Sequence, residues 1–281
     1  MKKILTLITF ISVVVAVSCN HASKERKKKS SDGIRIISLA PSITREVEEL
    51  GMGGNIVGAT SYCEITIENS DLIIGDAINV NVEKVLLLKP DVILTTTLTK
   101  QSTIALFREN GINIHVVGKL DSFDDICHQF EELGKIIGSH DNAMLIIEKT
   151  KSRVDSIRKT IPERIKGQKI FIQVGVDPLF AVIPNTFMDD YIKFTGCKNV
   201  TYGFTGGTIS RETILNRNPD VVLIATMGIV AEQEKKLWGS FKGMNAVKNG
   251  KVFIIDANVA CVPTVENFGK AFEDIVHLIE K

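Results

Sequence analysis

Short polar and aromatic segments follow most of the apolar runs in this chain, and they are the residues best suited to bind a ligand. They are Ala40–Ser42, Ser61–Cys63, Gly75–Ala77, Thr95–Thr97, Gly175–Phe180, Phe204–Gly207 and Asn258–Pro263. Open α/β sheets bind ligands in loops at the carboxyl ends of their strands. Small, hydroxylic and aromatic side chains there suit a bulky ligand held by contact and a few hydrogen bonds. Any one of these segments can also be read as a plain turn.

The sequence carries no recognisable catalytic or metal-binding motif. The five histidines show no metal-ligand spacing and no partner Cys-x-x-Cys pair. The glycines of Gly51–Gly54 follow a predicted helix instead of a strand, so a dinucleotide site is not supported. P-loop, nucleophile-elbow and kinase signatures are also missing. The sequence therefore indicates binding without a reaction, no catalytic residue and no resident cofactor or metal.

The elements that must position these segments alternate between strands and helices. Strands are predicted at Ile34–Leu39, Ile56–Thr60, Val92–Thr95, Ile114–Val117, Lys169–Val174, Val221–Ala225 and Val252–Asp256. A helix with Ser42 as its N-cap is predicted to end near Gly51, and further helices cover Val82–Leu88 and Ile104–Asn110. This alternation predicts an α/β fold with parallel sheets covered by helices.

A gapless internal match divides the chain into two similar halves. Glu83–Leu94 aligns with Glu212–Leu223 at an offset of 129 residues, and in each copy a helix ends at Pro before a buried strand. The match predicts duplicated units, although helix-Pro-Asp-strand is also a common α/β joint. Between the halves, an apolar stripe at helical spacing predicts one helix over Ser139–Ile161. Such a helix is either a strut between two lobes or an ordinary surface helix.

The N-terminal segment has the pattern of an export signal. Lys2 and Lys3 precede the apolar run Ile4–Val17, which is too short to span a bilayer comfortably. The run ends at Ser18-Cys19 and resembles a bacterial lipoprotein signal, in which Cys19 is acylated; cleavage without lipidation stays open. We therefore expect a signal peptide at residues 1–18, a lipid-anchored basic tether at 19–33, an N-terminal α/β lobe at 34–138, a linking helix at 139–163 and a C-terminal α/β lobe at 164–281.

Composition narrows the class of partner. The chain has 281 residues, 44% of them hydrophobic, and a net charge of +1, which excludes a disordered chain and disfavours a nucleic-acid-binding one. From residue 34 onward, acidic residues outnumber basic ones. Export would place Cys63, Cys127, Cys197 and Cys261 in a compartment that permits disulfides, and the sequence does not choose among their pairings.

Six sequence blocks together resemble one family. They are Arg35–Thr44, Val57–Cys63, Asn81–Leu94, Phe171–Phe180, Ile209–Glu212 and Asn245–Asp256. From Arg35 to the C-terminus the chain resembles a class III substrate-binding protein of an ABC importer, a family whose members deliver cobalamin, haem or iron-siderophore complexes. The first and fourth blocks most resemble the cobalamin-binding branch. The resemblance implies two Rossmann-like lobes with mainly parallel sheets, joined by a single long α-helix, with a ligand cleft between them.

The resemblance also assigns roles to residues. It implies that Glu83 and Glu212 dock to basic residues on the two permease subunits, although both can be read as ordinary solvated glutamates near helix starts. The expected ligand-binding residues are Pro41, Ser42, Tyr62, Cys63, Ala77, Thr96, Asp177, Phe180, Phe204, Gly206, Ala260 and Cys261.

Departures from the family pattern concern the ligand. Cobalamin-binding relatives line the cleft with several tryptophans, whereas the single Trp238 falls in a peripheral helical stretch and the matching positions hold small residues. The loop Asn258–Pro263 lacks the arginines that meet anionic siderophores. The preferred ligand is therefore cobalamin or a related corrinoid, and haem is the second choice. Tyr62 as a haem ligand, and Cys63 or Cys261 as metal contacts, are weaker hypotheses than packing.

The expected function is therefore that of a substrate-binding lipoprotein of the cell envelope. It would capture cobalamin or a related metal chelate, deliver it to an ABC permease dimer, act as a monomer, and bind no nucleic acid. Haem or a siderophore is the alternative ligand. An exported α/β enzyme with an active site between the lobes, and a signalling or adhesion lipoprotein, are the alternatives from other classes.

Overall fold

The computed structural model describes residues 33–76, 78–226 and 228–281. The predicted signal peptide, Cys19, residues 20–32 of the tether and Ala77 lie outside the described residues. Gly33–Lys281 form one compact unit. Among the described residues, no helix has both the length and the apolar character needed to cross a bilayer.

The first sheet has four parallel strands in the order β2-β1-β3-β4. They are β1 (Ile36–Ser38), β2 (Ile56–Ala59), β3 (Val92–Thr96) and β4 (Asn113–Val117). Its helices are α1 (Pro41–Glu49), α2 (Ile65–Glu68), α3 (Val82–Leu88), α4 (Gln101–Glu109) and α5 (Phe123–Ile137), with 3₁₀ turns at Gly53–Asn55 and Ser70–Leu72. We call this sheet with α1–α5 the first lobe.

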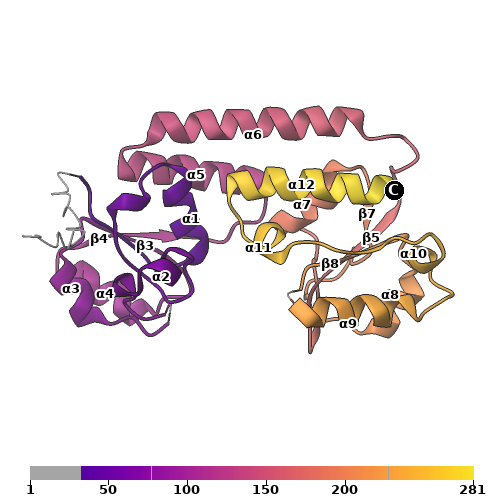
Figure 1. The fold of residues 1–281 in the computed structure, drawn as a ribbon, viewed down its shortest axis with the longest axis horizontal. Helices are drawn as coiled ribbons and strands as arrows, with labels where there is room; N and C mark the ends of the chain where they lie inside the picture. The colour runs from indigo at the N-terminus through magenta and orange to yellow at the C-terminus, as the bar shows by residue number, and fades with distance from the viewer. Residues whose placement is uncertain (1–32, 77, 227) are drawn as a thin grey trace, which may run out of the picture. The chain divides into compact units, whose positions relative to one another are not determined.

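The second sheet has the order β6-β5-β8-β9, and β7 pairs with the start of β5. Its strands are β5 (Lys169–Val176), β6 (Leu179–Ala181), β7 (Lys198–Asn199), β8 (Val221–Ile224) and β9 (Val252–Ile254). Its helices are α7 (Phe187–Phe194), α8 (Arg211–Arg217), α9 (Gly228–Gly239), α10 (Asn245–Lys248), α11 (Ala257–Ala260) and α12 (Val265–Glu280). With α7–α12 this sheet forms the second lobe, so the predicted two-lobe α/β fold with mainly parallel sheets is confirmed (Figure 1).

Some details of the fold differ from the sequence-based expectation. Ser42 is not an N-cap, because α1 already begins at Pro41 after the extended residue Ala40. Proline suits the first helical position, since its fixed φ fits the helix and its missing N–H would have no partner there. Two short strands were also not predicted: β6, which is antiparallel to β5, and β7, which pairs with the start of β5.

The internal repeat is a structural repeat. Helices α3 and α8 keep the 129-residue offset, and both end at a residue with left-handed backbone, Lys89 at φ 46° and Asn218 at φ 48°. Each begins at a side-chain N-cap, Asn81 in α3 and Ser210 in α8. Equivalent sequence therefore gives equivalent starts and stops in both lobes.

An aspartate follows each of these two helices and binds the backbone at the start of the first strand of the same sheet. Asp91 Oδ2 accepts a hydrogen bond from the backbone N–H of Arg35 at 2.7 Å. Asp220 Oδ2 accepts one from the backbone N–H of Lys169 at 2.9 Å. Because the same contact fixes α3 and α8 on their sheets, residues at equivalent positions of the two helices hold equivalent places in the two lobes.

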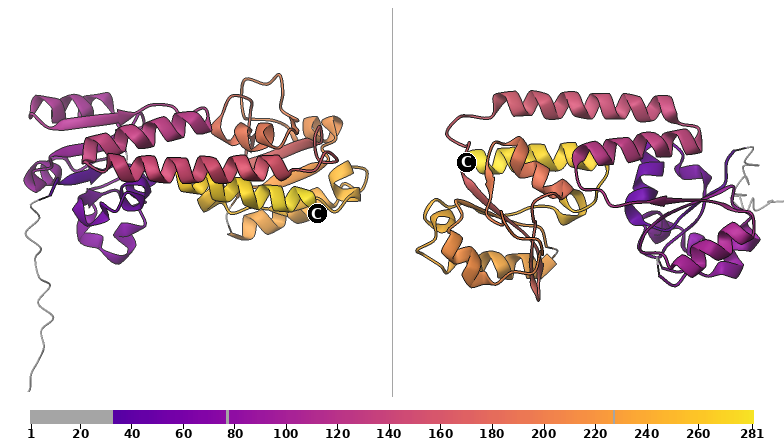
Figure 2. Two further views of the ribbon diagram at one scale, coloured as in Figure 1. Left: turned by 90° about the horizontal axis from the view of Figure 1, so that it is seen from above. Right: turned by 180° about the vertical axis from the view of Figure 1, so that it is seen from behind.

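The long helix α6 (His140–Thr160) joins the lobes and packs along both α5 and α12 (Figures 1 and 2). Its predicted stripe is buried at Ala143, Ile147, Thr150 and Val154. The helix is not the only bridge, because the ring of Phe123 on α5 stacks on Phe268 of α12 with centroids 4.1 Å apart. One continuous hydrophobic cluster includes side chains from both lobes. The lobes therefore share a packed layer as well as a connecting helix.

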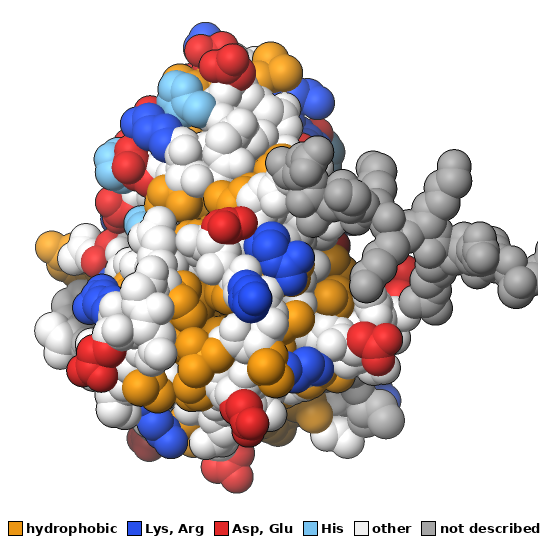
Figure 3. Space-filling view, turned by 90° about the vertical axis from the view of Figure 1, so that its left-hand side faces the viewer, with side chains coloured by type: hydrophobic (Ala, Val, Ile, Leu, Met, Phe, Trp, Pro, Cys, Tyr) orange, Lys and Arg blue, Asp and Glu red, His pale blue; other side chains and the backbone are white. Residues whose placement is uncertain are grey.

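Some apolar side chains of the first lobe stay on its surface. Leu87 of α3 and Leu106 of α4 are both exposed. Figure 3 shows the end of the molecule that carries this lobe, with hydrophobic side chains gathered among scattered charged ones.

Candidate ligand-binding cleft

The parallel strands bring the predicted first-lobe segments to one edge of the sheet. Backbone hydrogen bonds join Ser61 N–H to Gly75 O at 2.9 Å, and Ile74 N–H to Ala59 O at 3.0 Å. The segment around Gly75 therefore lies beside the end of β2. Pro41 at the end of β1 shares a pocket with Tyr62. These segments lie where open α/β sheets bind ligands.

Two aromatic side chains are exposed at the carboxyl edges of the sheets, one in each lobe. Tyr62 is 73% exposed and Phe180 is 45% exposed. Leu98, after β3, adds an exposed apolar side chain on the first lobe. Monomeric proteins expose few large apolar side chains together unless they contact something else. These residues supply a contact surface for a ligand with a large apolar body.

Two glycines allow Phe180 to take its position. A Cβ atom at Gly207 would meet ring atoms of Phe180 at 2.5 Å, and one at Gly175 would meet its Cβ at 2.9 Å. The Phe180 segment also forms a bridge with Thr208. Glycine at 207 therefore lets the phenyl ring of Phe180 pack closely against the backbone at that position.

Several predicted ligand-binding residues lie beneath the surface instead. Cys63 is buried, and its Sγ accepts a hydrogen bond from Thr44 Oγ1 at 3.0 Å. Ala260 is buried, with its carbonyl accepting a hydrogen bond from the Tyr191 hydroxyl. Burial raises the pKa of the half-buried Cys261 to about 11, so its thiol stays protonated at neutral pH. Cys63 therefore packs against α1, and Ala260 and Cys261 lie at the carboxyl edge of the second sheet.

The remaining predicted residues divide in the same way. Ser42 and Thr96 are half-buried, and Pro41, Asp177 and Gly206 are exposed. Phe204 lies elsewhere, because its ring packs 4.4 Å from the Arg217 guanidinium at the end of α8, next to the amino edge of the second sheet. The structure therefore does not bring Phe204 together with Tyr62 and Phe180.

The four cysteines of the described residues are free thiols.

Trp238 is on α9 and is wholly buried, and its Nε1–H donates to Gln173 Oε1 at 2.7 Å. It therefore serves the core of the second lobe. Within the described part of the chain, no group of three or more His, Cys, Asp or Glu side chains is placed to hold a metal ion.

A small pocket of about 110 Å³ lies between the lobes next to Tyr62, with Arg45 in its wall. Arg45 binds Glu64 Oε1 at 2.6 Å in its own lobe, and its Nη1 donates to the Asn258 carbonyl of the second lobe at 3.2 Å. Asn258 also lines a pocket of about 430 Å³ on the second lobe. The two pockets share this residue, so the hydrogen bond from Arg45 links the lobes beside both pockets.

The sequence analysis missed Arg45, and it also missed Glu49 one turn later on α1. Glu49 Oε1 accepts a hydrogen bond of 2.9 Å from the hydroxyl of Thr264, the N-cap of α12. The spacing of four residues places Arg45 and Glu49 on one helix face, which is the only signal the sequence offers for this contact. Its partners are distant in sequence, so the pattern alone does not identify them.

Glu49 makes the contact between the lobes sensitive to pH. Burial raises its pKa from 4.5 to about 7, and the hydrogen bond from Thr264 opposes this shift. Between about pH 4.5 and pH 7, Glu49 is therefore protonated in the folded protein but has lost its proton in the unfolded chain. The free energy of unfolding should fall as pH rises from about 4.5 to about 7, by up to about 3 kcal/mol from this group.

Glu49→Gln is expected to remove this part of the pH dependence and to stabilise the protein at pH 8. The measurement is urea denaturation of wild type and variant between pH 4.5 and 8. Glu109→Gln, at an exposed position on α4, is the matched control and should follow the wild type. Parallel curves for wild type and Glu49→Gln would contradict the assignment.

The predicted docking residues hold matching places on the two lobes. Glu83 and Glu212 are each the second residue of their helix, α3 and α8, and both side chains are exposed. Helices that precede a parallel strand run against it, so both helix starts lie toward the carboxyl edges of the sheets. Neither glutamate forms an ion pair with another described residue.

Comparison with known proteins agrees with this geometry. Residues 36–259 match the family described as periplasmic binding protein. The chain is 29% identical over 255 residues to the ABC transporter substrate-binding lipoprotein YvrC of Bacillus subtilis, covering 88% of this chain and 80% of that one. It is 26% identical over 269 residues to the high-affinity heme uptake system protein IsdE of Staphylococcus aureus, covering 90% of this chain and 89% of that one.

Among solved structures, the periplasmic vitamin B12 binding protein BtuF of Vibrio cholerae has a similar fold. It superposes with a TM-score of 0.73 at 21% identity, over 88% of this chain and 97% of that one. At this identity the likeness concerns the fold alone.

Proposed function

We propose that this chain, which belongs to the periplasmic binding protein family as a class III substrate-binding component of an ABC importer, captures cobalamin or a related corrinoid. It would then deliver this ligand to a permease. The exposed pair Tyr62 and Phe180, one on each lobe, is the observation that carries the proposal. Two aromatic side chains on separate lobes suit a broad ligand that contacts both.

The charges around the cleft disfavour a ligand that presents several acidic groups. Arg45 is the one basic residue among the lining of the two cleft pockets within the described part of the chain, and it is already paired with Glu64. Acidic side chains are more numerous there: Glu48, Glu64, Glu232 and Asp256 line the same pockets. The corrin ring carries neutral amide side chains at its edge and cobalamin has a single phosphodiester, whereas haem carries two carboxylates and many siderophores carry several carboxylates or catecholates. A buried anion needs a cation partner, so the corrinoid fits better.

Haem is the second candidate, because a specific observation favours it. The Tyr62 side chain is largely exposed, and a tyrosine oxygen is a known type of haem iron ligand. The relative IsdE is named as a heme uptake protein. In this alternative, Tyr62 contributes an iron ligand as well as ring contact.

The proposal includes a place in the cell and a partner. Acylation at Cys19 would anchor the protein to a membrane of the cell envelope, with residues 20–33 as a basic tether. Glu83 and Glu212 would each meet a basic residue on one subunit of the permease dimer, because two equivalent acids suit a two-fold partner. The protein would act as a monomer and release its ligand unchanged.

Native mass spectrometry and absorbance after incubation with cyanocobalamin, haemin and a ferric siderophore test the proposal. One cobalamin per chain, recovered chemically unchanged, is the expected result. Binding of one haem per chain would favour the haem alternative, provided that Tyr62→Phe loses both the haem and its iron-phenolate absorbance. If none of the three compounds binds, the proposed ligand class is wrong. If a bound compound is reproducibly converted, an exported enzyme is favoured instead.

A further inference from the structure

A second cavity, of about 780 Å³, opens on the second lobe away from the cleft. Its wall includes Lys169 at the start of β5 and Arg217 at the end of α8, which lie at the amino edge of the second sheet. The cleft residues lie at the carboxyl edge of that sheet. Ligand pockets for organic molecules typically measure about 300 to 1,000 Å³, so the cavity is large enough for one.

One side of this cavity is apolar. Pro184, Ile192, Val200 and Tyr202 line it, and Tyr202 is 79% exposed. Such a wall suits the hydrocarbon or aromatic part of a ligand.

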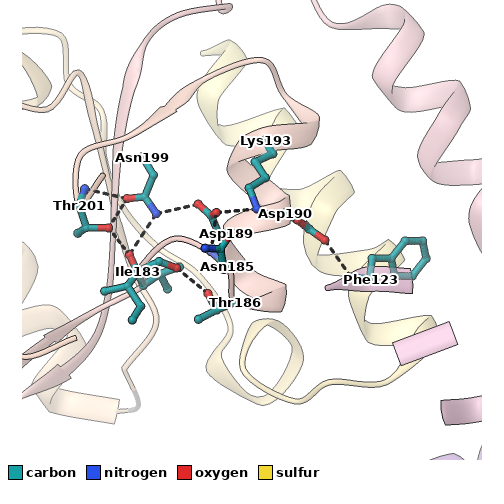
Figure 4. Close-up of polar contacts among 10 residues, drawn as sticks. Phe123, Ile183, Asn185, Thr186, Asp189, Asp190, Lys193, Asn199 and Thr201 are labelled. Carbon is teal, nitrogen blue, oxygen red and sulfur yellow. Dashed lines mark hydrogen bonds and ion pairs between the residues drawn. The ribbon is translucent and has the colours of Figure 1, made fainter. Parts of the chain in front are cut away.

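A polar network next to this wall is already satisfied (Figure 4). The buried carboxylate of Asp189 binds Lys193 Nζ at 2.9 Å and Asn199 Nδ2 at 2.8 Å, and it accepts from the Asn185 N–H at 3.2 Å. Lys193 also reaches Asp190 at 3.5 Å. Asp189 and Lys193 both line the cavity and compensate each other there, whereas Asp190 does not line it. The other lining residues therefore set the net charge of the cavity wall.

Three cations of the cavity have no acidic partner. Lys169 Nζ donates to the backbone carbonyl of Arg217 at 2.6 Å, and Arg217 Nη1 donates to the carbonyls of Val200 and Tyr202. Lys198 is exposed. None of Lys169, Lys198 and Arg217 forms an ion pair within the described part of the chain. Carbonyl partners hold Lys169 and Arg217 in place without neutralising their charge, so the cavity is positively charged beside an apolar wall.

We propose that this cavity is a second ligand site, which binds a small organic anion with an apolar body. The acidic head of the ligand lies near Lys198, Lys169 and Arg217, and its tail or ring lies against Val200 and Tyr202. The site is separate from the cleft and does not depend on which ligand the cleft holds.

Fluorescence titration with 8-anilinonaphthalene-1-sulfonate, followed by competition with decanoate and decan-1-ol, tests the proposal. Saturable binding of one probe per chain is expected. Decanoate should displace it at least about tenfold better than the neutral alcohol, because only the carboxylate accepts charged hydrogen bonds from the cations of the cavity. Lys198→Glu should weaken decanoate binding about tenfold, and Tyr202→Ala should weaken the probe and decanoate alike.

Lys235→Glu, at an exposed position on α9, changes the net charge equally and should leave decanoate binding unchanged. Equal effects of Lys198→Glu and Lys235→Glu would overturn the proposal, because they would reflect net charge only. Equal displacement by decanoate and decan-1-ol, or binding that does not saturate, would also overturn it. Displacement of the probe by cyanocobalamin would assign the probe to the cleft instead.

Discussion

Reversal of both docking glutamates, in the variant Glu83→Arg with Glu212→Arg, is expected to abolish most uptake while leaving ligand affinity unchanged. Both side chains are exposed at the second position of equivalent helices, so their replacement disturbs no buried contact. Each arginine would face a basic residue of the permease, and like charges at an interface cost several kcal/mol. Uptake of labelled ligand by cells should therefore fall by more than about tenfold, with each single variant intermediate.

The matched control reverses two other exposed acids, Glu109 on α4 and Asp141 on α6, and should transport normally. It carries the same change of net charge on helices that are not part of the repeat. Normal uptake by the Glu83 and Glu212 double variant would remove the docking assignment. Equal loss in the control would assign the effect to overall charge.

Removal of the two exposed aromatic rings is expected to have the largest effect on ligand affinity. Tyr62→Ala and Phe180→Ala should each weaken binding about tenfold, and about a hundredfold together, because contacts on separate lobes are independent and their free energies add. Neither ring belongs to the buried core, so the melting temperature should change little. Isothermal titration calorimetry of the single and double variants measures the effect.

Tyr202→Ala provides the matched control, since Tyr202 is as exposed as Tyr62 but lines the second cavity. Its affinity for the cleft ligand should equal that of the wild type. If Tyr202→Ala weakened binding as much as Tyr62→Ala, the ligand would not lie in the cleft.

The sequence predicted those parts of the fold that depend on local patterns. The spans of α3 and α8 follow from a repeat whose caps and prolines are encoded within a few residues of each helix. The error at Ser42 arose because a serine near a helix start is a common N-cap, while Pro41 at the first helical position moved the start forward. The strand β6 was missed because three residues are too few to show a period.

The site was less predictable, because its key contacts join residues far apart in the chain. Arg45 meets Asn258, and Glu49 meets Thr264, at separations of 213 and 215 residues. No spacing rule connects such pairs. Burial was also hidden from the sequence, since Cys63 and Ala260 belong to the predicted loops yet lie beneath the surface. The exposed Tyr62 and Phe180 were predicted because their segments follow strands of the sheets.

Hydrogen-deuterium exchange with and without cyanocobalamin tests most directly whether a ligand is held between the two lobes. The account predicts slower exchange on binding in both lobes, at Ser61–Glu64 in the first and at Leu179–Ala181 in the second, with no change at Lys198–Tyr202. Protection confined to one lobe, or protection at Lys198–Tyr202 alone, would contradict capture of the ligand in the cleft.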